Sequence, residues 1–118
     1  MLASCGSNEE EIKEEERYDV STVKVGNLEV MTEDLGHMSW DDAKKACADL
    51  GDGWRLPTKD ELNVLYENKD EIGGFAGYPY WSSTESDFSD AWSQNFYDGY
   101  QNLYVKGYIS DVRSVRAF

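Results

Sequence analysis

The sequence predicts a single α+β domain, because its strand-like and helix-like segments come in separate blocks rather than alternating. A β-hairpin comes first, two capped helices follow it, and short strands rich in aromatic residues make up the final third. The length of 118 residues gives room for one domain, which we assign to residues 18–118. Residues 1–17 precede it as a separate segment.

Turn and cap residues mark the hairpin and the first helix. Residues 23–31 alternate apolar and polar side chains around Gly26-Asn27, a pair that tolerates the positive φ of a tight turn. Ser39 begins the first helix with an acidic variant of the capping box, and Gly51 is placed to end it. We therefore expect an N-terminal hairpin followed by a helix between these two residues.

The second helix begins at Thr58, where Glu61 completes a full capping box. Its buried face is supplied by Leu62, Leu65 and Tyr66, and we expect the helix to fray within residues 68–72. The Gly73-Gly74 pair and Pro79 then mark a loop. Short strands are predicted after it at residues 80–84, 91–96, 100–106 and 112–118, with Asp98-Gly99 as the hairpin turn between the second and third.

The charge of the chain excludes one large class of partners. The formal net charge is −13, whereas binding to nucleic acid or to an anionic membrane surface requires clustered lysine and arginine. Only Arg113 and Arg116 come close to a basic cluster, and they lie in an apolar strand. No segment approaches the roughly 20 apolar residues that cross a bilayer. We expect no nucleic-acid partner.

The N-terminal segment resembles the start of a bacterial lipoprotein. Leu2-Ala3-Ser4-Cys5-Gly6 is similar to a lipobox, in which the cysteine thiol is acylated, although only Met1 precedes it here. Residues 9–17 hold six glutamates against one lysine and one arginine, which predicts a disordered acidic tether or, alternatively, a solvated charged helix. The resemblance implies a Gram-negative outer-membrane lipoprotein that is exposed on the cell surface and contacts the membrane only through a lipid at Cys5. The alternative is an incidental cysteine.

The reactive residue types do not form a recognisable catalytic or metal site. Cys47 lies on the apolar face of the first helix, where it is expected as a buried free thiol. His37 is the only histidine and is expected in a surface loop, so neither Ser–His catalysis nor a zinc site has enough groups. We predict a non-catalytic protein without a cofactor or a bound metal. Glu85, Asp87 and Asp90 form one acidic loop. A solvated loop is the simpler interpretation, and calcium binding there is the alternative.

Most of the large aromatic and cationic residues are expected to hold the structure together. Aromatic residues in a small domain mostly build its core, and arginines mostly bind partly buried carboxylates through forked hydrogen bonds. This interpretation applies to Trp54, Trp81, Trp92, Arg55, Arg113 and Arg116.

The candidate ligand-binding residues are the polar and tyrosine positions between those anchors. Tyr, Ser, Asn and Asp form adaptable binding surfaces, because tyrosine offers contact area at a low entropy cost and the others hydrogen-bond flexibly. Strand alternation predicts that Trp92, Gln94 and Phe96 share one face, with the polar positions on the other. The predicted site comprises Ser93, Asn95, Tyr97, Asp98, Tyr100, Asn102 and Tyr104, unless these are ordinary exposed strand residues.

Five motifs, in order, resemble the bacterial C-type-lectin-like domain family of the collagen-like adhesin C-terminal type. They extend over nearly all of residues 23–118: Trp54-Arg55-Leu56-Pro57-Thr58, Tyr80-Trp81-Ser82-Ser83-Thr84, Ala91-Trp92 with Phe96, Gly99 with Gln101, and Val112-Arg113-Ser114-Val115-Arg116. The one departure is Ser114, where family members usually carry proline. The resemblance implies a C-type-lectin-like fold and adhesion or ligand display. It does not imply calcium-dependent sugar binding, because the calcium motifs of animal lectins are absent.

Three functional hypotheses follow from the residues and the resemblance. The favoured one is a surface-tethered, adhesin-like module that recognises a glycan or a surface protein. The second is a receptor protein diversified by a retroelement, with its variable positions among the same candidate residues. The third is a structural subunit of envelope assembly that has no soluble ligand.

Overall fold

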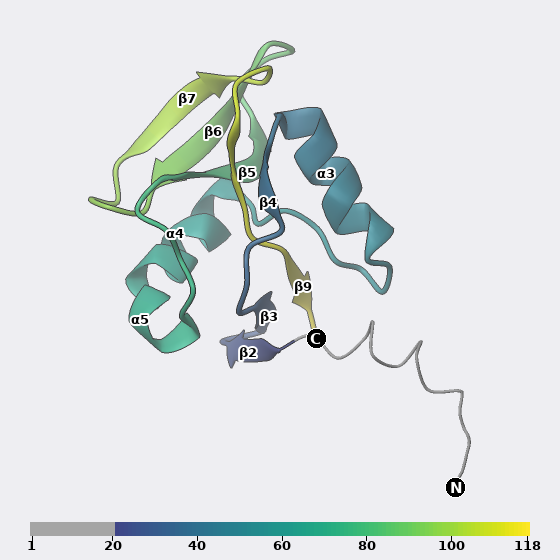
Figure 1. Cartoon of the computed structure of the whole chain (residues 1–118), viewed down its shortest axis with the longest axis vertical. Coiled ribbons are helices and arrows are strands. Elements are labelled where there is room, and N and C mark those ends of the chain that lie inside the picture. Colours follow the sequence, from purple (N-terminus) through teal and green to yellow (C-terminus); the bar gives the residue numbers. More distant parts are fainter. Residues whose placement is uncertain (1–20) are drawn as a thin grey trace, which may run out of the picture.

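The computed structural model describes residues 21–118, and its element order confirms the α+β fold (Figure 1). The predictions for Cys5 and for the acidic segment lie outside the described residues. The elements are β2 (Thr22–Val25), β3 (Leu28–Met31), β4 (Gly36–Met38), α3 (Trp40–Asp49), α4 (Lys59–Glu67), α5 (Lys69–Ile72), β5 (Pro79–Glu85), β6 (Asp90–Asn95), β7 (Gln101–Val105), β8 (Ser110–Val112) and β9 (Val115–Ala117).

The strands form two sheets. The small sheet has the order β2-β3-β9, and the large sheet has the order β4-β8-β5-β6-β7. The N-terminal hairpin is confirmed, with Val25 paired to Leu28 around Gly26, whose φ is 59°. Figure 1 shows β7 at the outer edge of the large sheet and the small sheet gathered around the end of β9.

The strand predicted at residues 112–118 is wrong as a single element. Arg113 and Ser114 interrupt it, so that β8 belongs to the large sheet and β9 to the small one. Both residues are fully buried and turn their polar groups to other segments, the Ser114 hydroxyl donating to the carbonyl of Arg55 at 3.2 Å. Ser114 therefore lies in the link between two strands.

Both helix starts are confirmed by their cap geometry. The Ser39 side chain accepts a hydrogen bond from the amide of Asp42, and Gly51 follows α3 with a φ of 74°. Thr58 and Glu61 form the reciprocal capping box of α4. The predicted fraying is replaced by α5, a short helix that follows Asn68, whose side chain makes no cap hydrogen bond to it. Among residues 21–118, no helix has the length and apolarity to cross a membrane.

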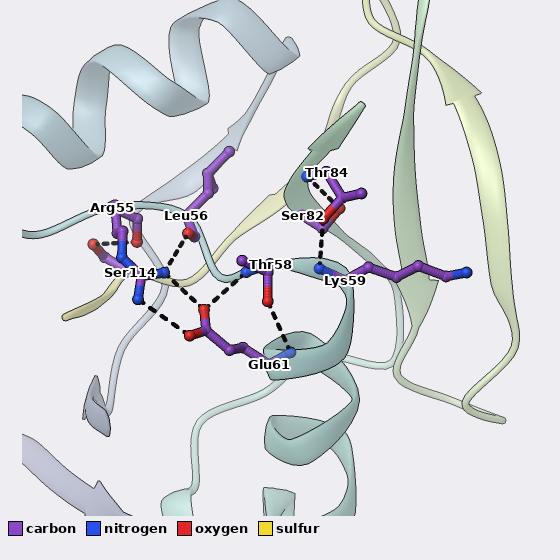
Figure 2. Close-up of polar contacts among 8 residues, drawn as sticks. All are labelled: Arg55, Leu56, Thr58, Lys59, Glu61, Ser82, Thr84 and Ser114. Atoms are coloured by element: carbon purple, nitrogen blue, oxygen red, sulfur yellow. Dashed lines mark hydrogen bonds and ion pairs between the residues drawn. The ribbon is translucent and has the colours of Figure 1, made fainter. Parts of the chain in front are cut away.

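The connector before α4 is fixed by polar contacts (Figure 2). The Arg55 guanidinium binds Glu61 through two hydrogen bonds, Nη1 to Oε1 at 2.7 Å and Nη2 to Oε2 at 3.1 Å. The amide of Lys59 donates to Thr84 Oγ1 at 2.9 Å and links the helix start to β5. The forked Arg55 pair predicted from sequence is therefore confirmed, and its acceptor is the cap glutamate.

The large sheet is covered on both faces. Successive strand residues point to opposite sides, so Trp81 joins the cluster around α3 and Tyr80 joins the cluster around α4. Trp40, Ala43 and Cys47 are the α3 side chains of the first cluster, and Cys47 is fully buried as a free thiol, as predicted. Burial raises the pKa of this thiol and keeps it in the neutral, unreactive form.

Arg113 connects the two sheets. Its side chain is fully buried, and its Nε donates to Asp34 Oδ1 at 2.9 Å, while Nη1 donates to the carbonyls of Met31 and Gly73. Nη2 lies 2.8 Å from the same Asp34 oxygen as an ion pair, but it is not aligned for a hydrogen bond. The hydroxyl of Tyr80 donates to the other Asp34 oxygen at 2.7 Å. Burial and this carboxylate raise the pKa of Tyr80.

The remaining structural predictions are confirmed in most respects. Trp81 and Trp54 are buried, and Trp54 lies under the guanidinium of Arg116. Arg116 donates to Glu29 at 2.9 Å, and the hydrogen bonds of Thr22 and Arg116 lower the pKa of that carboxyl. Trp92 differs, because it is only half-buried and the Lys59 ammonium covers its ring at 3.7 Å.

Candidate functional site

The residues predicted to bind a ligand lie on and around the β6–β7 hairpin, and the structure brings most of them to the surface. Tyr97 is 81% exposed and Tyr100 64% exposed, and Asp98 and Asn102 are also exposed. Asn95 and Tyr104 are half-buried. Tyr104 packs edge-on against Trp81, so it belongs partly to the core.

Ser93 is not on the surface, and the expectation that it faces outward is wrong. Its side chain is 2% exposed and its hydroxyl donates to the carbonyl of Asn102 at 3.3 Å. The cause is the position of β6 between β5 and β7, where Ser93 stands beside Trp81 on the face that α3 helps to cover. Trp92 and Gln94 share the opposite face, as predicted, and Phe96, which lies just beyond the end of β6, packs with Tyr80 in the cluster on that side.

Two of the predicted site residues build the turn that displays the tyrosines. Asn95 Oδ1 accepts from the amide of Tyr97 at 2.8 Å, and Asp98 Oδ1 accepts from the amide of Tyr100 at 3.0 Å. Such side-chain bonds to the following backbone are how Asn and Asp stabilise turns. Gly99 has a φ of 84°, and a Cβ there would lie 2.6 Å from Tyr66 of α4. The turn is therefore pressed against the helix.

A partly buried amide network, which the sequence did not reveal, anchors the hairpin to α4. Gln94 Nε2 donates to Asn63 Oδ1 at 2.9 Å and to the carbonyl of Gly99 at 3.0 Å. Gln101 Nε2 donates to the carbonyl of Lys59 at 3.0 Å and to Gln94 Oε1 at 3.2 Å. Because the buried Gln94 amide is satisfied within this network, the hairpin is held in one geometry before any ligand arrives.

The structure also exposes apolar residues that sequence reasoning assigned to strands without placing them at a site. Leu103 is 42% exposed and Val105 46% exposed on β7, and Tyr108 and Ile109 are each 59% exposed in the turn that follows. The available signal was the absence of any charged residue between Gly99 and Val105. We call the exposed side chains of Tyr97, Asp98, Tyr100, Asn102, Leu103 and Val105 the hairpin surface.

The acidic loop between β5 and β6 uses its carboxylates internally. Glu85 binds the ammonium of Lys106 at 2.6 Å, which lowers the pKa of this carboxyl. Asp87 accepts from the amide and hydroxyl of Ser89 and from the amide of Asp90, and these bonds lower its pKa. Over residues 21–118, no group of three or more His, Cys, Asp or Glu side chains is placed to hold a metal ion.

His37 lies in β4 rather than in the loop predicted for it, although its side chain is 75% exposed. Its Nδ1 is 4.0 Å from Asp111 on the neighbouring strand. Burial and the nearby Asp34 raise the pKa of Asp111. The hydroxyl of Ser110 is buried on the same strand, and adjacent strand residues point to opposite faces. These three groups therefore do not form a nucleophile, base and orienting acid.

Comparison with known protein families identifies the domain type. The Lcl C-terminal domain family matches residues 13–116, which is most of the chain. The chain belongs to this family.

Comparison with solved structures shows that this Lcl C-terminal domain has a C-type-lectin-like fold. Botrocetin aligns with a TM-score of 0.61 at 12% identity, covering 82% of this chain and 96% of botrocetin. A chain in the complex of botrocetin with the von Willebrand factor mutant (I546V) A1 domain aligns with a TM-score of 0.58 at 10% identity, covering 82% and 96%. No curated protein matches the sequence.

Proposed function

We propose that this chain is a non-catalytic, surface-tethered ligand-binding module of the adhesin type, which recognises a glycan or a protein through the hairpin surface. One observation carries the proposal. Of the ten large apolar or aromatic side chains that are exposed in residues 21–118, six lie between Tyr97 and Ile109. Exposed apolar groups that gather in one region of a soluble domain mark interaction sites, whereas scattered ones do not.

The chemistry of the hairpin surface supports binding rather than catalysis. Tyr97 and Tyr100 present large, rigid contact areas, and Asp98 and Asn102 beside them offer hydrogen-bond groups. The turn bonds of Asn95 and the amide network of Gln94 fix the backbone beneath them. A pre-organised surface loses less conformational entropy on binding than a flexible one does.

The structural neighbours support a macromolecular ligand. Botrocetin, whose fold this chain shares, is found in a complex with the von Willebrand factor A1 domain, which is a protein. The fold is therefore able to present a protein-binding surface. This supports a protein ligand for the present chain as much as a glycan.

The tether is proposed from the sequence. Leu2-Ala3-Ser4-Cys5-Gly6 supports acylation at Cys5, which would place the domain on the outer membrane of a Gram-negative bacterium and facing outward. Mass spectrometry of the native protein from its cell membranes tests this. We expect an N-terminal peptide that begins at a diacylglyceryl-modified Cys5. A native protein with an unmodified Cys5 thiol would contradict the anchor.

The binding experiment uses the full chain on glycan and surface-protein arrays, in calcium and in chelator. We expect a ligand whose affinity falls at least about tenfold in Tyr97→Ala and in Tyr100→Ala, since aromatic residues dominate binding energies. Phe118→Ala is the matched control, because Phe118 is 59% exposed but lies after β9, in the small-sheet region. Equal losses in all three variants, or no ligand in either condition, would refute the proposed surface.

A further inference from the structure

β7 is an edge strand that lacks the features by which such strands are usually protected. It is the outermost strand of the large sheet among the described residues, and it is five residues long. Residues 99–105 contain no charged residue and no proline, in a chain of which 30% is charged. Edge strands are normally protected by lysine, proline, bulges or shortness, because their open backbone groups pair readily with other strands.

The register of β7 identifies which backbone groups are open. The amide of Asn95 donates to the carbonyl of Tyr100, and the amide of Lys106 donates to the carbonyl of Ser89. Because bonded and non-bonded pairs alternate along an antiparallel ladder, residues 102 and 104 also face β6. The amides of residues 101, 103 and 105 therefore point away from the sheet. The carbonyl of Val105 accepts from Tyr108, which leaves those of residues 101 and 103 open.

The side chains of β7 are suited to flank an added strand on both faces. Leu103 is exposed opposite Trp92, and Val105 continues the same face. Tyr100 and Asn102 are exposed on the other face. In recognition by strand addition, the open backbone supplies affinity and the alternating side chains supply selectivity.

The charges around β7 indicate the chemistry of the occupant. Asp98 is exposed shortly before the first residue of β7. Asp90 lies opposite Val105 at the other end of the strand, beside the acidic β5–β6 loop. Lys106 also lies at that end, but Glu85 already neutralises it. The middle of the strand is uncharged and both ends are acidic, and the whole chain carries −13. Like charges across an interface disfavour a second copy of this chain and favour a basic partner.

We propose that β7 is the docking edge for an extended segment of a partner protein, uncharged at its centre and basic at both ends, which pairs with Gln101–Val105 as an added strand. This inference rests on the proposed binding function and specifies the partner class for the same surface. The segment bonds the open amides of residues 101, 103 and 105 and the open carbonyls of residues 101 and 103, and its apolar side chains pack against Leu103 and Val105.

The test uses the full chain, labelled with nitrogen-15, and one synthetic probe. The probe is the acetylated and amidated peptide with the sequence Lys-Lys-Thr-Val-Thr-Val-Thr-Lys-Lys. We expect the peptide to slow hydrogen exchange at the amides of Gln101, Leu103 and Val105 by at least about tenfold at saturation. The amides of residues 102 and 104 should not change, because they are already bonded to β6.

Two substitutions at one position separate backbone pairing from side-chain contact. Leu103→Pro removes an amide that faces solvent, a position where edge strands tolerate proline, and should weaken peptide binding at least about tenfold. Leu103→Ala keeps that amide and should weaken binding only about threefold. Replacing the four lysines of the peptide by glutamates should abolish binding.

Four results would overturn the inference. They are the absence of protection at millimolar peptide, protection at other amides, undiminished binding by Leu103→Pro, and protection of the same three amides without peptide. In the last case, dependence on protein concentration would identify a second copy as the occupant, and independence would identify residues 1–20 of the chain itself. A failure here, combined with an array ligand that the tyrosine variants weaken, would leave the proposed function standing.

Discussion

The two edges of the large sheet differ in how far they are closed. At one edge, β4 has three residues, carries the exposed His37, and leads through Ser39 directly into α3. The Trp81 indole donates to the carbonyl of Met38 at 2.9 Å and ties the end of this strand to β5. At the other edge, β7 is longer, uncharged, and leaves alternate backbone groups open. We infer from this difference that one edge completes the fold and that the other is available for recognition.

The closed edge is also where the buried charges are concentrated. Asp34 precedes β4, and Arg113 follows its neighbour β8. Their pairing is shared with Tyr80 and with the carbonyl of Met31 in the small sheet. The open edge is anchored by neutral amides, those of Gln94 and Gln101. We expect substitutions in the buried anchors of either edge to affect folding, and substitutions at the exposed positions of β7 to affect binding.

The largest effect is expected from Arg113→Met. The substitution leaves Asp34 without its cation and two carbonyls without their donor, which costs about 3–5 kcal/mol of unfolding free energy for a buried pair. Urea denaturation measures it. Lys45→Met is the control, because Lys45 pairs with Asp49 at the surface and should change stability by less than about 0.5 kcal/mol. Equal losses of unfolding free energy in the two variants would contradict the claim that the buried pair of Arg113 and Asp34 stabilises the fold more than a surface pair does.

A smaller loss is expected from Gly99→Ala, which disturbs the anchoring of the open edge. Alanine at a φ of 84° is strained, and its Cβ would meet the Tyr66 ring at 2.6 Å. Together these effects should cost about 2–4 kcal/mol. Gly107→Ala is the matched control, because no atom lies within 4 Å of a Cβ there. A thermal melt that shows the two variants to be alike would mean that the turn is not held against α4.

Glu61→Gln should have the smallest effect and should depend on pH. The hydrogen bonds from Arg55 lower the pKa of Glu61 below its reference value of 4.5. A carboxyl with a lowered pKa stabilises the fold above its unfolded pKa, and this stabilisation is lost as pH falls through the folded pKa. The variant should therefore be less stable by about 1–2 kcal/mol at pH 7. The gap between the unfolding free energies should narrow as the pH falls below 4.5 and close below the lowered pKa of Glu61, and a gap that stays constant with pH would contradict this.

The local parts of the fold were predictable from the sequence because their signals are local. The capping box of Thr58 and Glu61, the Gly26 turn and the apolar position of Cys47 each depend on residues a few positions apart. The break at Arg113 could not be predicted in this way, because it depends on Asp34 and Gly73, which are distant in sequence. The local signals gave the α+β class, and the family resemblance supplied the C-type-lectin-like fold that they could not.

The candidate site was predicted in part. Tyr97 and Tyr100 are exposed as expected, because a turn of Asn, Asp and Gly lifts its neighbours away from the core. Ser93 was misplaced because alternation gives the two faces of a strand but not whether both are covered. The exposure of Leu103 was missed because an apolar residue in a strand is normally assigned to the core, and only the strand order reveals an edge.

Hydrogen exchange of the full chain without any partner tests the central claim, that β7 is an open and preformed binding edge, most directly. We predict alternation along the strand: the amides of Gln101, Leu103 and Val105 should exchange at nearly the rate of an unfolded chain, while those of Asn102 and Tyr104 should be protected by β6. Uniform protection would show that the edge is already occupied. Uniform rapid exchange would show that the hairpin is not formed in solution, and either result would contradict the account.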